Sequence, residues 1–214
     1  MEPRRARLLP VASREPCGAG RSLYAVAVAL RGGAQPRDRG TGTGENCTVA
    51  TADAYARVSL DVADPCSDRA RELLSIYIEE VACRYYGRPL SRAERASALA
   101  DMPGDDLAEP RGVLLVARLD GKDVGCVGMR FVEGGIGEVT SLFVLEQMRG
   151  HGVGALLLTE LERIGTLRGL TVLRLDTRHD LVEARRLYAR HGFREVPAFN
   201  HEPYAERWFA KALK

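Results

Sequence analysis

Lysine is scarce in this chain of 214 residues, and no long apolar run occurs. Only 3 of its 31 basic residues are lysine, and the formal net charge is only +2. So small a charge does not indicate nucleic acid as a partner. The longest apolar run, at residues 23–30, is 8 residues long. A bilayer span needs about 20 residues, so no membrane partner is expected.

Cysteine is also sparse and follows no ligand pattern. The chain has 5 cysteines, an odd number, with no CxxC or Cys/His spacing. A disulfide framework and a metal site are therefore not expected. We expect a reducing, cytoplasmic location. Apolar residues make up 45% and charged residues 28%, which are ordinary values for a globular protein. A fibrous repeat and a largely disordered chain are excluded.

The first fifty residues differ from the rest of the chain. Residues 1–48 hold 8 arginines, no lysine and 4 acids, and are punctuated by 7 glycines and 4 prolines. We expect residues 1–50 to be a disordered or extension segment, with a targeting peptide as the alternative. Residues 56–214 are expected to form one folded domain.

The periodicity of residues 56–214 changes several times between two and 3.6 residues. Asp120-Gly121 predicts a hairpin turn, and Ser91 with Glu94, and Asp180 with Glu183, predict capping boxes at helix starts. The predicted strands lie at 56–62, 112–119, 123–132, 136–144, 170–175, 193–196 and 208–212, and the predicted helices at 70–86, from 91, at 151–165 and at 180–191. This order predicts a mixed α/β fold.

Three alternating glycines precede a leucine-rich helix. Gly150, Gly152 and Gly154 follow Arg149 directly. Glycine lets the backbone approach a ligand closely, and the free amides of a helix N-terminus favour an anion such as phosphate. Arg149 would add a charge-assisted donor at the same end. The alternative is a turn that only joins a strand to a helix.

The same glycines also fit the dinucleotide fingerprint G-x-G-x-x-A, with Asp176 near the place of a ribose-binding acid. Five residues separate the strand from Gly150, whereas a dinucleotide turn follows its strand directly. Hairpins, not helical crossovers, join the preceding strands. Only 38 residues follow Asp176, too few to complete a doubly wound sheet. A dinucleotide site is therefore disfavoured.

Two motifs together resemble a known family. The first, R/Q-x-x-G-x-G/A, is met by Arg149, Gly152 and Gly154. The second, L-Y-x-x-x-G-F, is met by Leu187-Tyr188 and Gly192-Phe193. One helix and one strand are predicted between the two motifs. In both motifs and in element order, residues 56–214 resemble the GNAT superfamily of acetyl-CoA-dependent N-acetyltransferases.

The resemblance implies a mostly antiparallel central sheet flanked by helices, with a splayed strand pair that forms the cofactor cleft. Acetyl-CoA is the implied co-substrate, with no metal. The pantetheine arm would pair with the backbone of Leu142, Phe143 and Val144. The diphosphate would bind the main-chain amides of the motif, namely Arg149, Gly150, His151, Gly152, Val153 and Gly154.

The resemblance also implies catalytic roles. Tyr188 would protonate the departing thiolate, or else only pack and position the cofactor. Glu138 would be the general base, or else a solvated strand carboxylate, and deprotonation through water is a further route. His151 is expected to be a loop residue. Leu181 stands where many relatives carry a cofactor-binding asparagine, so that contact would be absent or replaced by Asp180 or backbone.

The implied reaction is acetyl transfer from acetyl-CoA to a primary amine on a small molecule or peptide. The alternative is a non-catalytic module that binds or senses acyl-CoA, and a homodimer is left open. A peptide N-terminus, a polyamine, an amino acid and an antibiotic amine are all open as acceptors. The acceptor side would draw on Tyr77, Glu80, Tyr85, Tyr86, Phe199, Asn200, His201 and Tyr204, although aromatic residues at helical spacing are more often core.

Overall fold

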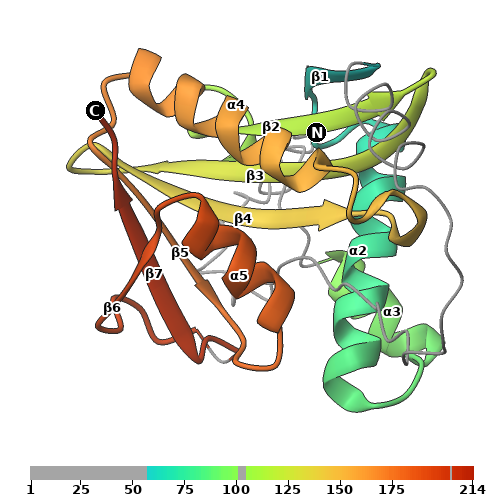
Figure 1. Cartoon of the computed structure of the whole chain (residues 1–214). Coiled ribbons are helices and arrows are strands. Elements are labelled where there is room, and N and C mark those ends of the chain that lie inside the picture. Colours follow the sequence, from blue (N-terminus) through green and yellow to red (C-terminus); the bar gives the residue numbers. More distant parts are fainter. Residues whose placement is uncertain (1–56, 101–104, 203) are drawn as a thin grey trace, which may run out of the picture.

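The computed structural model describes residues 57–100, 105–202 and 204–214 (Figure 1). The predictions for residues 1–50 therefore lie outside the described residues. No helix in the described ranges is long and apolar enough to cross a membrane.

Seven strands form one sheet in the order β1-β2-β3-β4-β5-β7-β6 (Figure 1). Every neighbouring pair is antiparallel except β4 and β5, which run parallel. The strands are β1 (Val58–Ala63), β2 (Gly112–Leu119), β3 (Lys122–Val132), β4 (Ile136–Val144), β5 (Val172–Thr177), β6 (Arg194–Val196) and β7 (Arg207–Ala212). The predicted mixed fold, mostly antiparallel, is confirmed.

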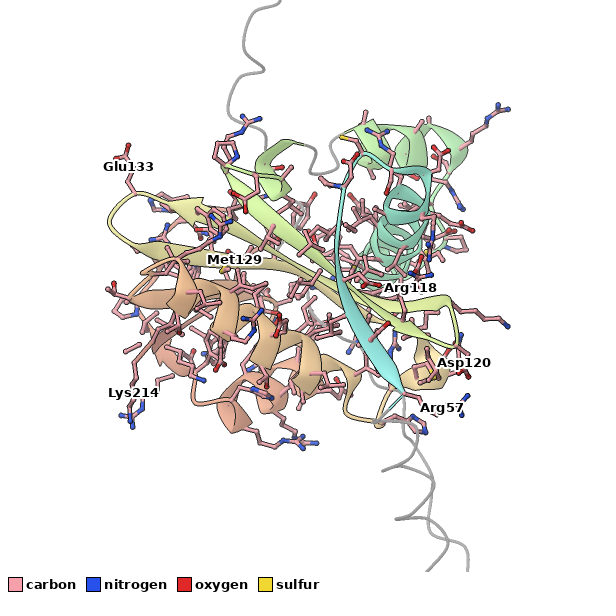
Figure 2. The ribbon with its side chains drawn as sticks, turned by 90° about the horizontal axis from the view of Figure 1, so that it is seen from above. Arg57, Arg118, Asp120, Met129, Glu133 and Lys214 are labelled. Atoms are coloured by element: carbon pink, nitrogen blue, oxygen red, sulfur yellow. The ribbon has the colours of Figure 1, made fainter. Side chains whose placement is uncertain are left out.

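Four described helices cover the two faces of the sheet. They are α2 (Asp68–Tyr86), α3 (Arg92–Ala100), α4 (Val153–Leu167) and α5 (Val182–Arg190), with short 3₁₀ turns η1 (Asp105–Leu107) and η2 (Glu146–Met148). Figure 2 shows α4 on one side of the sheet and α2 with α3 on the other. Buried apolar side chains at helical spacing fix α2 on its face: Ala70, Leu73, Leu74, Tyr77 and Ile78.

The two predicted capping boxes have different outcomes. Ser91 and Glu94 exchange side-chain and backbone hydrogen bonds at the start of α3, which confirms the first. The second was wrong, because α5 begins one residue later and its N-cap is Leu181, with no side-chain cap. Asp180 instead accepts from Arg178 at 2.7 Å and lies 3.5 Å from Arg84 Nε. Charge-assisted contacts to two guanidinium groups replace the cap.

The parallel pair β4–β5 is joined over only three residue pairs, which end at Glu138 and Arg174. Beyond that point the strands diverge, as the implied splayed pair requires (Figure 1). A β-bulge explains the divergence: two β4 residues, Ser141 and Leu142, stand opposite the single β3 residue Val127. Ser141 takes a left-handed conformation with φ 52°. A bulge bends and twists its strand, so β4 turns away from β5.

Candidate functional site

The diverging strands leave an unpaired edge of β4 that leads directly into the start of α4. Leu142, Phe143 and Val144 lie on this edge, with side chains that are at most 2% exposed. They pack into the core while their backbone follows the opening between β4 and β5. The carbonyl of Val144 already accepts a hydrogen bond from Arg149 Nε at 2.8 Å. Pairing of this edge with a pantetheine arm stays a prediction.

The glycine segment adopts a conformation that other residues would resist. Gly150 and Gly152 have φ of 79° and 82°, in the left-handed region that favours glycine. Gly152 is the N-cap of α4 and offers no side chain to its first turn. A Cβ at Gly154 would meet Leu187 Cδ2 at 3.1 Å, because α5 passes close to this turn. The geometry thus explains why each of these three positions is glycine.

The first turn of α4 presents free donors. The first backbone hydrogen bond of α4 is donated by the Leu156 amide and accepted by the Gly152 carbonyl. Among the described residues, the amides of Val153, Gly154 and Ala155 find no acceptor. Gly150 is exposed, and His151, Gly152 and Gly154 are partly exposed. Open amides at a helix N-terminus form a site for an anion such as a diphosphate.

Arg149 uses its side chain for a different purpose from the predicted anion contact. Both oxygens of Glu80, on α2, accept from Arg149 Nη2 at 2.6 Å. The guanidinium also lies over the Phe143 ring, and the side chain is only 6% exposed. Arg149 therefore ties α2 to the end of β4, and the backbone supplies the donors of the segment. His151 Nδ1 pairs with the Arg149 carbonyl at 3.0 Å, as expected of a loop residue.

We expect the Glu80–Arg149 ion pair to stabilise the fold. Breaking a buried pair costs about 3–5 kcal/mol, and we expect about 1–2 kcal/mol for Glu80→Gln because the Glu80 side chain is one third exposed. Urea unfolding measures this loss. Glu79→Gln is the matched control, because its pair with Arg95 is more exposed and should contribute less than about 1 kcal/mol. Equal losses for the two variants would contradict the prediction.

Tyr188, on α5, is held in an apolar setting. Its side chain is 3% exposed and packs against Phe193 and Phe209, with ring centroids 5.8 and 6.1 Å away. Burial, with a smaller contribution from the charge of Asp176, raises the pKa of the Tyr188 hydroxyl far above its usual value. Like any tyrosine hydroxyl, it holds its proton at neutral pH, and burial makes loss of that proton more costly than for an exposed tyrosine. Both predicted roles, acid and packing, are compatible with this geometry.

Glu138 lies at the last β4–β5 pair, between two arginines. Its carboxylate is 3.0 Å from Arg174 on β5 and 3.7 Å from Arg130 on β3. Arg174 donates to Oε2, with Nε at 3.1 Å, whereas the contact of Arg130 with Oε1 is an ion pair longer than a hydrogen bond. Glu138 therefore links β4 to β3 and β5 at the last residue pair before β4 and β5 diverge. Its role as a general base stays a prediction.

Asp176, on β5 two residues beyond the last β4–β5 pair, was not assigned to catalysis from the sequence. Its side chain is 5% exposed, and Oδ1 accepts from Asn200 Nδ2 at 2.8 Å. Oδ2 is buried without a hydrogen-bond partner among the described residues. Burial raises the pKa of Asp176 to about 6. Along β5 the residues Leu173, Arg174, Leu175 and Asp176 alternate between apolar and charged, so the pattern placed Asp176 on the polar face and gave no signal of its burial.

Asp176 should make the fold less stable as the pH rises. The pKa of Asp176 is higher in the folded chain than in the unfolded one. Between pH 3.8 and about 6, the carboxyl is therefore protonated in the folded state and ionised in the unfolded state. Above that window, the shift corresponds to about 3 kcal/mol of lost stability. Asp176→Asn should therefore be more stable than the parent at about pH 8, and the difference should shrink toward about pH 4.

Urea unfolding at several pH values tests this expectation. Asp120→Asn is the control, because Asp120 lies exposed in the β2–β3 hairpin and its change should give no comparable gain at high pH. A gain for Asp176→Asn that is equal at every pH would contradict the linkage.

The residues proposed for the acceptor side divide into three groups. Tyr77 is core, 5.8 Å from the Phe143 ring, and Glu80 is bound to Arg149. By contrast, Tyr85 lies edge-on to both Tyr86 and Tyr204, at 4.9 and 4.8 Å. Of the rest, Phe199 lies under Arg174, Asn200 binds Asp176, and His201 is exposed. The structure thus joins the end of α2 to the segment between β6 and β7.

Comparison with known proteins gives consistent results. The model of the acetyltransferase (GNAT) family matches residues 73–193. An uncharacterized N-acetyltransferase of Schizosaccharomyces pombe is 31% identical over 138 residues, which are 64% of this chain and 81% of that protein. An IAA acetyltransferase of Azospirillum brasilense is 39% identical over 101 residues, 46% of this chain and 63% of that protein.

The fold also has solved counterparts. The structure of the PaiA N-acetyltransferase of Thermoplasma acidophilum, in complex with coenzyme A, superposes with a TM-score of 0.57 and 16% identity. The match covers 72% of this chain and 99% of that one. At this identity the likeness concerns the fold alone.

Proposed function

Because the chain belongs to the GNAT acetyltransferase family, and is therefore an acyltransferase, we propose that it moves an acetyl group from acetyl-CoA to a primary amine. One observation carries this proposal: the unpaired edge of β4 ends in the open amides at the start of α4. An extended arm that ends in a diphosphate matches that sequence of a strand edge followed by an anion site. The PaiA relative binds coenzyme A, which supports the same ligand here.

The amides of Val153, Gly154 and Ala155 would receive the diphosphate. Gly150 and Gly152 would shape the loop around it, because both need a positive φ. Leu142, Phe143 and Val144 would offer backbone groups to the pantetheine arm. Arg149 and Glu80 would hold the end of β4 against α2 and so fix the position of the loop.

Tyr188 is the proposed proton donor. Acyl transfer to an amine needs a neutral nucleophile and benefits from protonation of the leaving thiolate. The Tyr188 hydroxyl carries a proton at neutral pH, and the negative charge that develops on the departing sulfur would draw this proton to it. Burial raises the pKa of the hydroxyl, so transfer would occur only as that charge develops. The leaving group then departs as a thiol, which is a weaker nucleophile than a thiolate.

Two measurements test this function. Calorimetry should give binding of acetyl-CoA and no comparable binding of NADH, whose site was disfavoured by the spacing of the glycines. Release of free thiol from acetyl-CoA should then increase with at least one amine in a panel of polyamines, amino acids, aminoglycosides and short peptides. Tight binding of acetyl-CoA without any such increase would favour the alternative, a module that binds or senses acyl-CoA. Absence of acetyl-CoA binding would refute both.

A further inference from the structure

Polar atoms without partners gather where β5 leads into α5. Eight buried side-chain atoms in the described ranges have no hydrogen-bond partner, and six of them belong to residues 176–185. This segment begins in the part of β5 that has no β4 partner, because the last β4–β5 pair ends at Arg174. Buried polar groups are normally satisfied, so this cluster calls for an explanation. A ligand bound beside the opening between β4 and β5 would supply missing partners.

Three aromatic side chains proposed for the acceptor side have guanidinium groups over their rings. With the distance from Cζ to the ring centroid, these pairs are Arg178 over Tyr85 at 4.9 Å, Arg88 over Tyr86 at 5.3 Å and Arg174 over Phe199 at 4.3 Å. Each guanidinium takes a position that a cationic acceptor would otherwise use, and its charge repels a second cation. These rings therefore disfavour a polyamine and favour an acceptor with a negative group.

One of these three arginines has an unsatisfied donor. Arg88 binds Glu94 and Arg174 binds Glu138, and within the described residues neither arginine has a buried nitrogen without a partner. Arg178 has such a nitrogen, because its Nη1 is buried and finds no acceptor in the described part of the chain. A buried donor without an acceptor is unfavourable, most of all on a charged group. Arg178 is therefore the arginine that gains most from an incoming anion.

The nearby carboxylates leave Arg178 Nη1 unpaired. Asp180 Oδ2 accepts from Arg178 Nη2 at 2.7 Å and also lies 3.5 Å from Arg84 Nε. Hydrogen bonds from His179, and to a lesser extent the charge of Arg178, lower the pKa of Glu206. Both acids thus already have partners. A planar guanidinium with one nitrogen committed and another unpaired is suited to the carboxylate of a ligand.

The Arg178 guanidinium lies beneath a surface side chain. The Arg178 side chain is 11% exposed, and Tyr85, whose ring lies over it, is 48% exposed. Tyr85 packs edge-on against Tyr86, which is 45% exposed, and against Tyr204. Exposed side chains change rotamer within nanoseconds. Rotation of the Tyr85 ring away from Arg178 therefore gives a ligand access without opening the core.

We propose, on the basis of the proposed acetyltransferase function, that the acceptor is an amine that also carries a carboxylate, as an amino acid does, and that Arg178 binds this carboxylate through Nη1. Arg178 follows β5 directly. An acceptor held there would direct its amine toward the opening between β4 and β5, where the acetyl group is proposed to arrive. Arg178 determines specificity and takes no part in the acetyl transfer itself.

The test asks whether the full-length protein recognises the carboxylate of its acceptor. The probes are amino acids and their carboxamides, and dipeptides with a free or an amidated C-terminus, which distinguish the two sources of the carboxylate. The readout is the ratio of kcat/KM for each acid to kcat/KM for its amide, with acetyl-CoA as donor. For at least one pair the ratio should be about 10 to 100, the range expected for a hydrogen bond to a charged group.

Intrinsic reactivity works against this result. A carboxylate favours the charged form of the amine beside it, so at neutral pH the amide has more of the neutral nucleophile than the acid has. A preference for the acid therefore comes from the protein.

Arg178→Gln should bring the ratio to about 1, mainly through a higher KM for the acid, because the charged donor is lost. Arg88→Gln is the matched control, since Arg88 also lies over a tyrosine ring but is bound to Glu94, and it should keep the parent's ratio. The ratio compares two acceptors on one preparation, so a general loss of folded protein or of acetyl-CoA binding cancels.

The inference is overturned if the parent's ratio stays below about 3 for every pair, if Arg178→Gln keeps the parent's ratio, or if Arg88→Gln loses it equally. The parent's ratio needs no variant, so it decides the matter even where Arg178→Gln does not fold. If the parent acetylates no amine at all, the proposed function fails, and this inference fails with it. An active parent that does not distinguish acid from amide refutes the carboxylate site alone.

Discussion

Gly152→Val should abolish acetyl-CoA binding, with a loss of affinity of at least about 100-fold. Gly152 has φ 82°, and a side chain there is strained by about 1–2 kcal/mol in the left-handed region, with more expected for a β-branched residue. The loop would relax to a negative φ and rotate the amides that follow it. A side chain would also project beside the proposed diphosphate position. Calorimetric titration with acetyl-CoA measures the effect.

Gly169→Val separates binding from strain. Gly169 follows the other end of α4 with φ 71°, and a Cβ added there would meet no atom within 4 Å. It therefore carries a similar backbone penalty far from the glycine motif. Both variants should lose stability in urea unfolding, and only Gly152→Val should lose acetyl-CoA affinity. Unchanged affinity in Gly152→Val would refute the proposed binding of the diphosphate at the start of α4.

Tyr188→Phe should lower kcat about 10- to 100-fold and leave acetyl-CoA affinity nearly unchanged, since only the proton donor is removed. Stability should not fall, because the hydroxyl makes no hydrogen bond among the described residues and the ring contacts with Phe193 and Phe209 are kept. Steady-state kinetics and urea unfolding on the same preparation give both quantities.

Phe193→Leu is the control for packing around Tyr188. It keeps the hydroxyl but weakens the ring contact, so it should reduce stability by about 1 kcal/mol and change kcat only slightly. If Tyr188→Phe keeps full kcat, the residue is only a packing group. If Phe193→Leu lowers kcat as much as Tyr188→Phe does, ring position and not proton donation is responsible.

Local patterns predicted the elements, and the resemblance predicted the splayed strands. The hairpin at Asp120-Gly121 and the capping box at Ser91 follow from residues that are neighbours in sequence, so their geometry was accessible. The helix start at Asp180 could not be predicted in this way, because its carboxylate accepts from Arg178 and also pairs with Arg84, which lies 96 residues away in the sequence. A capping pattern states what a side chain can bind, not what else the fold brings to it.

For the same reason, only part of the site could be predicted from the sequence. The glycine segment is continuous, so its conformation follows from its own residues. Asp176 and Asn200 meet because β7 returns beside β5, and Glu80 reaches Arg149 across 69 positions. Neither pairing leaves a local trace. The spacing therefore indicated an anion site, while the buried carboxylate and the arginine tie needed the three-dimensional structure.

The splay also bears on self-association. An unpaired strand margin normally invites another chain to add to the sheet, which is a route to aggregation. Here the margins of β4 and β5 that lack partners face each other inside one molecule, because the strands separate from a shared root at Glu138 and Arg174. Neither margin is an outer edge of the sheet, because those positions belong to β1 and β6. The protein can thus keep a stretch of backbone ready for an extended guest without exposing it to its own copies.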